Sequence, residues 1–288
     1  MKKISLVFCF SFLFSFSFAQ NPQYSPPSEK SYAVVKKLLP KVSDADIKKF
    51  RKTAAEPENV KLINDILSFL KYRRLIDGDI AIPKIYFASM TSNKKLKYTL
   101  GLYFSAQKVV ILNLDILNND SNPASKAFNF IIFSFALAHE LRHHEDAVKN
   151  VKFPSNALTE KNGYTVSVKV LDAFLRMNEE TADTVDIKNF YEIIQANRNY
   201  IANMRRIQLL MMKAADILLK NKKKICAKLG VDEAMFNFFG FIPEIQFNAK
   251  DGGHIVNIDA SFGKPVRDLR FAVNTISEEV EILSAPAK

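Results

Sequence analysis

Cysteine is scarce in this 288-residue chain, which contains only Cys9 and Cys226. Cys9 lies in an apolar N-terminal stretch that we expect to be cleaved off, so a single cysteine remains and no internal disulfide can form. For an exported protein, the lack of disulfides fits a bacterial periplasm or exterior better than a eukaryotic secretory pathway.

Long apolar runs are also missing after the first twenty residues, so we expect no membrane span in the mature chain. The first twenty residues have the order of a secretory signal peptide. Lys2 and Lys3 precede an apolar stretch from Ile4 to Phe18, and Ala19 provides a small residue at the cleavage position. Cleavage after Ala19 predicts an exported protein, periplasmic or extracellular, whereas an uncleaved stretch would act as an anchor.

Acidic residues are outnumbered, and the formal net charge is +11, or +9 without Lys2 and Lys3. The densest basic run is Lys220 with Lys222, Lys223 and Lys224. No aromatic residues are interleaved there, as a nucleic-acid groove would require. We interpret the run as a solvated helix end, where cations favour the helix dipole. Nucleic acid is therefore not an expected partner.

Histidine occurs only four times, and three of the four lie together at His139, His143 and His144. His139-Glu140-Leu141-Arg142-His143 is an H-E-x-x-H pattern at the end of an apolar run. On a helix, residues four apart project from one face, so His139 and His143 can share a metal ion while Glu140 acts on water. Zn²⁺ is the expected ion. The alternative is a polar helix end whose histidines bond to carbonyl groups.

The order of elements predicts an α+β fold. Helical spacing within residues 20–82 precedes three candidate strands at Lys84–Ala88, Tyr98–Phe104 and Lys108–Leu114. A metal-binding helix from about Ala124 to Asn150 follows. We expect a loop from Val151 to Gly163, a helical or mixed segment from Tyr164 to Met177, a long helix from Phe190 to Leu219, and a short helix after Gly230 through Phe239. Strand-like runs fill the tail from Ile242 to Leu283.

A catalytic zinc site needs a third protein ligand and an open position for water. The metzincin pattern would supply a glycine and a third histidine on the same segment, but Asp146 and Lys149 hold those positions. Asp146 faces the same side as His139, yet seven helical residues separate them by about 10 Å, too far to share one ion.

A later acidic cluster offers the third ligand. Glu179 and Asp183 lie four residues apart on one helical face, 36 and 40 residues beyond His143. The cluster resembles that of the gluzincin metallopeptidases, in which such a glutamate binds the metal and an aspartate four residues on orients a ligating histidine. This resemblance implies the first role for Glu179 and the second for Asp183. Glu180 is the rival ligand, and an ordinary acidic helix start is the alternative reading of the whole cluster.

These two motifs resemble the gluzincin clan of zincin metallopeptidases. Glu179-x-x-Ala182-Asp183 is similar to the E-x-x-A-D of the CAAX prenyl-protease and heat-shock metallopeptidase family, which includes soluble, minigluzincin-like relatives. The resemblance implies His139, His143 and Glu179 as zinc ligands and Glu140 as general base. It also implies a zincin-like core with a small N-terminal sheet and the H-E-x-x-H helix, followed by a mostly helical C-terminal half.

Four segments follow from this reading: a signal peptide at 1–19, a helical segment at 20–82, a metallopeptidase core at 83–186, and a C-terminal part at 187–288. Many gluzincins use a later histidine or tyrosine to stabilise the oxyanion, and His254 is the only histidine left for that role. The favoured alternative is that His254 is an exposed turn residue. The predicted function is zinc-dependent hydrolysis of peptide or protein substrates. The alternative is an exported zincin-fold protein that binds a partner without significant catalysis.

Overall fold

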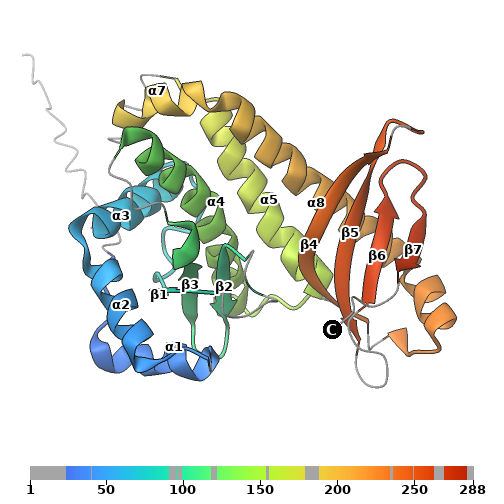
Figure 1. Ribbon diagram of the computed structural model, residues 1–288, viewed down its shortest axis with the longest axis horizontal. Helices are drawn as coiled ribbons and strands as arrows, with labels where there is room; N and C mark the ends of the chain where they lie inside the picture. Colours follow the sequence, from blue (N-terminus) through green and yellow to red (C-terminus); the bar gives the residue numbers. More distant parts are fainter. Residues whose placement is uncertain are drawn as a thin grey trace, which may run out of the picture.

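The computed structural model shows two lobes joined by a pair of long helices (Figure 1). It describes residues 24–39, 41–90, 96, 99–117, 122–153, 156–178, 188–233, 236–248, 250–262 and 269–283. The predicted signal peptide and its cleavage site lie outside these residues. No described helix combines the length and the apolar character that crossing a bilayer requires.

Short helices form the outer layer of the first lobe. They are η1 (Glu29–Tyr32), α1 (Ala33–Leu38), α2 (Asp44–Ala55) and α3 (Pro57–Tyr72). Ser43 and Asp46 form a reciprocal capping box at the start of α2, and Pro57 opens α3. The apolar face of α3 is buried, including Ile63, Ile66, Leu67 and Leu70.

A three-stranded sheet lies beneath these helices. Its strands are β1 (Lys84–Ala88), β2 (Gly101–Phe104) and β3 (Val109–Asn113), in the order β1-β3-β2. β1 runs parallel to β3, whereas β2 runs antiparallel to it. The three predicted strands are confirmed, with β2 shorter than expected. The central strand, β3, is buried along its whole length, which explains its unbroken apolar sequence.

The motif helix is α4 (Pro123–Val148), which matches the prediction closely. The next helix, α5, spans Asn156–Leu175, so the predicted loop from Val151 to Gly163 is wrong over its second half. Gly163 and Pro154 suggested a loop because both disfavour helix. Packing against α4 overrides this preference and buries Val166, Val170 and Phe174 of α5.

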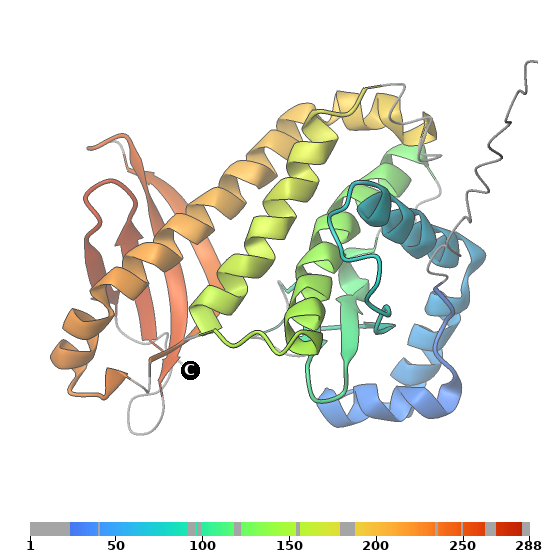
Figure 2. The same cartoon turned by 180° about the vertical axis from the view of Figure 1, so that it is seen from behind.

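Two helices replace the single long one expected from Phe190 to Leu219. They are α7 (Lys188–Ala196) and α8 (Arg198–Leu229), with the break at Asn197. The basic run at Lys220–Lys224 therefore lies within α8 and not beyond its end. The helix ends at Gly230, which adopts the left-handed conformation common at helix C-termini. Figures 1 and 2 show α8 running antiparallel to α5.

The second lobe is an antiparallel sheet packed on α8. Its strands, in spatial order, are β4 (Phe236–Asn248), β5 (Gly253–Phe262), β6 (Leu269–Asn274) and β7 (Val280–Leu283). The short helix predicted through Phe239 is wrong, because β4 begins at Phe236. Val256, Ile258, Phe271 and Val273 pack with residues of α8 to form a second hydrophobic core. The strand-like tail is confirmed, but as a complete four-stranded sheet.

Candidate metal centre

The two motif histidines lie side by side near the end of α4. The residues before them, from Phe130 to Ala138, are buried, and His139 is itself only 9% exposed. The rings of His139 and His143 have centroids 4.7 Å apart and are nearly perpendicular. The sequence prediction that these residues share one helix face is therefore confirmed.

Glu160 of α5 reaches both histidines. Nε2 of His139 lies 3.2 Å from Oε2 of Glu160, and Nε2 of His143 lies 3.7 Å from Oε1. The three donor groups lie within 4.8 Å of one another. Donors at about 2.1 Å from a tetrahedral ion stand roughly 3.4 Å apart, so this buried group could hold a metal ion.

The floor of the site is shaped by a glycine. A Cβ atom at Gly163 would lie 2.6 Å from Cε1 and 2.7 Å from Nε2 of His139. Only glycine leaves room for the ring at this place on α5. The next residue, Tyr164, packs its ring edge against His139 with centroids 4.8 Å apart. Glu160 and Tyr164 are one turn apart, so one face of α5 builds one side of the site.

Glu140 faces the sheet. A Cβ atom at Gly101 of β2 would lie 2.9 Å from Cγ of Glu140, so β2 passes close to this side chain. Burial raises the pKa of Glu140, although the nearby His139 and His143 oppose the shift. A carboxylate with a raised pKa is a better proton acceptor than an exposed one.

The charges of Glu160 and of the two histidines stabilise one another. Burial opposes ionisation of Glu160, but its interactions with His139 and His143 outweigh burial and lower its pKa. Burial also opposes protonation of His143, but the contact with Glu160 and the charge of Glu140 outweigh it and raise the pKa. Glu160 is therefore an anion paired with imidazole groups, and a cation could take the place of their shared proton.

A buried polar network continues from the histidines to the end of α4. Arg142 lies 3.2 Å from a carboxylate oxygen of both Glu145 and Asp146. Glu145 also accepts a hydrogen bond of 2.5 Å from the backbone N–H of Asp77. Asp146 accepts one of 2.6 Å from the side chain of Asn162 on α5. The network thus connects α4 to the segment before β1, through Asp77, and to α5, through Asn162.

The remaining histidine of the stretch, His144, points the other way. Its Nδ1 lies 3.1 Å from the hydroxyl of Tyr103, and its Nε2 lies 3.0 Å from the carbonyl oxygen of Ala81. Burial lowers the pKa of His144, so the ring is neutral and can bond at both nitrogens. His144 connects α4 to β2 through Tyr103 and is not part of the His139, His143 and Glu160 group.

The predicted third ligand, Glu179, lies outside the described residues, as do its rival Glu180 and the predicted supporting residue Asp183. His254 is described. It lies on β5, where Nε2 is 2.5 Å from Arg206 and the ring packs on Phe247. The structure does not bring His254 into the His139, His143 and Glu160 group.

Sequence reasoning missed Glu160 because it assigned residues 151–163 to a loop. The sequence nevertheless contains a spacing that indicates a helix through Glu160. Val166 and Val170 are buried on one face of α5, and stepping back along that face in threes from Val166 reaches Gly163 and then Glu160. Gly163 hid the continuation, because glycine inside a helix is usually unfavourable.

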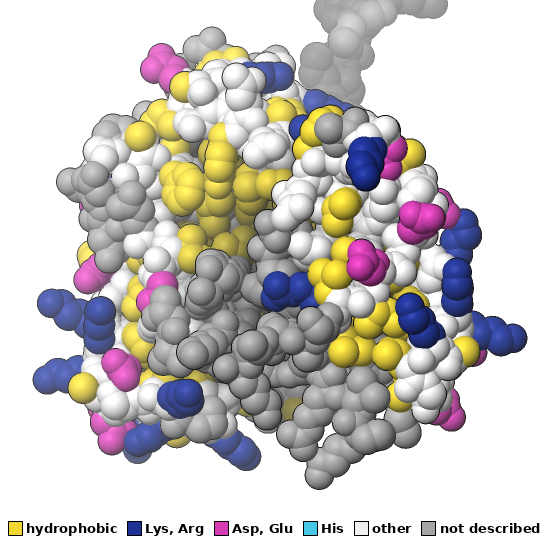
Figure 3. Space-filling model, turned by 45° about the vertical axis from the view of Figure 1, so that its right-hand side comes forward, with side chains coloured by type: hydrophobic (Ala, Val, Ile, Leu, Met, Phe, Trp, Pro, Cys, Tyr) yellow, Lys and Arg dark blue, Asp and Glu magenta, His cyan; other side chains and the backbone are white. Residues whose placement is uncertain are grey.

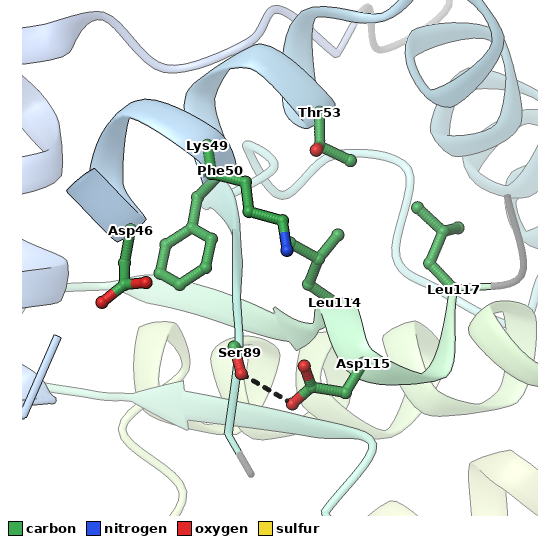
Figure 4. Close-up of a pocket in the computed structure, with 8 residues that line it drawn as sticks. All are labelled: Asp46, Lys49, Phe50, Thr53, Ser89, Leu114, Asp115 and Leu117. Carbon is green, nitrogen blue, oxygen red and sulfur yellow. Dashed lines mark hydrogen bonds between the residues drawn. The ribbon is translucent and has the colours of Figure 1, made fainter. Parts of the chain in front are cut away.

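A pocket elsewhere in the first lobe lies between α2 and η2 (Leu114–Ile116), shown in Figure 4. Within it, the carboxylate of Asp115 accepts hydrogen bonds from the hydroxyl of Ser89 and the backbone N–H of Met90. The pocket's described lining includes two carboxylates, Asp46 and Asp115, but no histidine. It offers a weaker case for chemistry than the buried histidine pair.

Figure 3 shows one face of the molecule, on which basic side chains are spread around the rim with acidic ones among them. Hydrophobic side chains gather in the upper part of that face. Among its described side chains, the positive charge therefore forms no continuous groove of the kind that tracks a nucleic-acid backbone.

No protein-family model, curated protein or solved structure matches the chain. The candidate function therefore depends on the geometry of the site itself. That geometry consists of two imidazole nitrogens and one carboxylate converging in a buried place, with a second buried carboxylate, Glu140, beside them.

Proposed function

We propose that the chain is an exported zinc-dependent metallopeptidase with a zincin-like core. In this proposal His139, His143 and Glu160 hold the zinc ion, and Glu140 is the general base. The observation that carries it is the convergence of Glu160 with the two H-E-x-x-H histidines. The two histidines come from one helix and the glutamate from the next. The motif that carried the gluzincin resemblance placed this ligand at Glu179, so Glu160 departs from that resemblance.

The donor set fits zinc. Two imidazole nitrogens and one carboxylate oxygen are a common set of protein ligands in catalytic zinc sites, and a fourth position stays open. When bound, zinc would polarise the scissile carbonyl group and bring the pKa of a water molecule towards 7. The paired charges of Glu160 and the histidines support this assignment, because metal binding replaces a proton in such a pair.

Glu140 would take a proton from the attacking water and pass it to the leaving amine. Its burial supports this role, because burial raises the pKa of Glu140 and so makes it a stronger base. Gly101 leaves space for its side chain, so Glu140 packs closely against the edge strand of the sheet.

The arrangement of β2 supports a peptide as the substrate. β2 is at the edge of the sheet, runs antiparallel to β3, and contacts Glu140 through Gly101. An extended peptide can add to an exposed sheet edge through main-chain hydrogen bonds. A substrate bound along β2 would thus place its backbone beside the general base.

The decisive experiment compares the purified protein with the Glu140→Gln variant on a mixture of unstructured peptides. The variant should keep one zinc ion per chain and lose at least about a hundredfold of the turnover, as expected when a general base is removed. Equal turnover by both proteins would refute the mechanism. If the protein binds zinc but cleaves no peptide in a way that requires Glu140, the chain is instead a zincin-fold binding protein.

The third ligand is tested separately. Glu160→Gln should lower zinc affinity sharply, whereas Glu179→Gln should leave it unchanged if Glu160 completes the site. The opposite result would restore Glu179, the ligand that the sequence motif suggested. His139→Ala is the reference for a lost ligand, because every version of the proposal assigns His139 to the metal.

A further inference from the structure

One buried nitrogen of the metal centre has no described acceptor. Nε2 of His143 faces Glu160, while Nδ1 on the other side of the ring is buried and has no hydrogen-bond partner among the described residues. A neutral imidazole that binds a metal through Nε2 carries its proton on Nδ1. That N–H group normally donates to a carboxylate or carbonyl, because an unsatisfied buried donor is costly.

Asp146 is the carboxylate placed to accept it. It follows His143 by three residues, so the two side chains project from the same side of α4. Asp146 is only 4% exposed, and its Oδ2 already accepts a hydrogen bond from Asn162. Its other oxygen, Oδ1, is buried and, within the described part of the chain, makes no hydrogen bond, although Arg142 lies 3.2 Å away.

We propose that Asp146 positions His143 for metal binding by accepting the Nδ1–H hydrogen bond. Asn162 and Arg142 hold the Asp146 carboxylate on either side. In this arrangement the Nδ1–H group of His143 donates to Oδ1 of Asp146, and both are buried atoms without a hydrogen bond in the described part of the chain. The inference rests on the proposed metal site but not on peptide hydrolysis. It replaces Asp183, which the sequence motif suggested for this supporting role.

Glu145 provides an internal comparison. It lies beside Asp146, is equally buried at 5% exposure, and pairs with the same arginine. Its carboxylate, however, is already bonded to the backbone N–H of Asp77 and to Arg142. Each carboxylate oxygen of Glu145 thus accepts a hydrogen bond, whereas Oδ1 of Asp146 accepts none within the described part of the chain. Glu145→Gln is therefore a control of matched burial and charge.

Asn162 adds a second connection. It lies on α5, two residues after Glu160, and its side chain donates to Asp146. The bond therefore joins the helix that carries the carboxylate ligand to the support of a histidine ligand. In the proposed arrangement, α4 and α5 cannot shift against each other without disturbing both ligands.

The test measures zinc affinity by competition with a chromophoric chelator, together with the melting temperature of each zinc-free protein. Removal of a group that supports a metal ligand typically weakens binding by about 10- to 100-fold, so Asp146→Ala should have an effect of this size. Asp146→Asn should weaken binding less, because its amide oxygen can still accept. Glu145→Gln and Asp183→Asn should bind zinc as the wild type does.

Several outcomes would overturn the proposal. Unchanged affinity in Asp146→Ala would do so, and so would an affinity loss confined to Asp183→Asn. Equal losses in Asp146→Ala and Glu145→Gln would reduce Asp146 to a general structural role. If the wild type takes up no zinc, the proposed function fails as well, which distinguishes that result from a failure of the Asp146 assignment alone.

A measurement on the wild type covers the case in which the Asp146 variants do not fold. Nitrogen-15 NMR of the zinc-loaded protein should show a proton on Nδ1 of His143 that exchanges slowly with water. A ring with Nδ1 unprotonated, or with a rapidly exchanging Nδ1 proton, would contradict the hydrogen bond.

Discussion

At the scale of single residues, two glycines decide whether functional side chains fit. Gly163 borders the ring of His139 and Gly101 borders Glu140, each at a distance too short for an added Cβ atom. Both residues therefore contribute to the site because a glycine has no side chain to occupy this space. Gly163 borders a proposed metal ligand and Gly101 borders the proposed base, so substitutions at the two positions can distinguish effects on metal binding from effects on proton transfer.

The first prediction concerns Gly163→Ala. In an ordinary helix this change stabilises by up to about 1 kcal/mol, but here the methyl group must displace the His139 ring. Zinc affinity should fall at least about tenfold, which isothermal titration with a competing chelator can measure. Gly101→Ala should keep its zinc and lose turnover, since it meets Glu140. Unaltered zinc binding in Gly163→Ala would contradict the placement of α5.

A second residue-scale prediction concerns alkaline stability. Burial raises the pKa of Tyr32 to about 12, above the value near 10 of an unfolded tyrosine. The unfolded chain therefore releases the tyrosine proton first. Stability from this group is fully present below pH 10 and is lost as the pH rises from 10 towards 12.

Tyr32→Phe isolates this contribution. Urea unfolding of the wild type and the variant should give similar stability at pH 8, within about 1 kcal/mol for the loss of one hydroxyl group. The difference should move in favour of the variant between pH 10 and 11.5. A difference that does not change over this range would show that Tyr32 titrates normally.

At the scale of elements, the capping box at the start of α2 shows how neighbouring residues can determine where a helix begins. Ser43 caps α2 with a reciprocal bond to Asp46, so Ser43→Ala should cost about 1 kcal/mol of unfolding free energy. Ser28 occupies the same position before η1 but makes no capping bond with its side chain. Ser28→Ala should therefore change urea unfolding little, and equal losses in both variants would argue against the capping box.

At the scale of the whole molecule, two hydrophobic cores share the helix α8. Ile201 belongs to the first core, whereas Ala214 and Leu218 belong to the second. The candidate metal centre draws its residues from α4 of the first lobe and from α5, and none from the sheet of the second lobe. The second lobe can therefore be weakened without touching a metal ligand.

Phe271→Ala tests this separation. Phe271 is fully buried on β6, and loss of a buried phenylalanine ring typically costs about 3–5 kcal/mol. Hydrogen exchange should accelerate in β4 to β7, while the zinc affinity of the protein stays as in the wild type. A matching loss of zinc would show that the lobes unfold as one unit.

Metal removal is the other whole-molecule prediction. In the proposed site zinc would bind only the folded chain, so free zinc at 100 times the dissociation constant should stabilise the protein by about 2.7 kcal/mol. A chelator should lower the melting temperature correspondingly, and the His139→Ala variant should respond to neither. A metal-independent melting temperature in the wild type would exclude a preformed site. Lower pH should also weaken binding, because protons compete for the imidazole nitrogens.

The local pattern of the sequence determined much of the first lobe. The spacing of His139 and His143, the apolar runs of β1 and β3, and the cap of α2 are short-range features. Each depends on residues a few positions apart, so periodicity and capping rules are sufficient to find them. The same rules placed both histidines on one face of α4 and identified Glu140 beside them.

Tertiary packing decided the rest. Glu160 became a candidate ligand only because α4 buries the face of α5 that carries Gly163, against the weak helix preference of that glycine. Phe236 to Leu283 became a sheet because α8 offers an apolar surface for its strands. Such long-range contacts are not encoded in short windows of sequence. Hence the sequence by itself supplied the two histidines and the base, and only the folded chain brought a third donor to them.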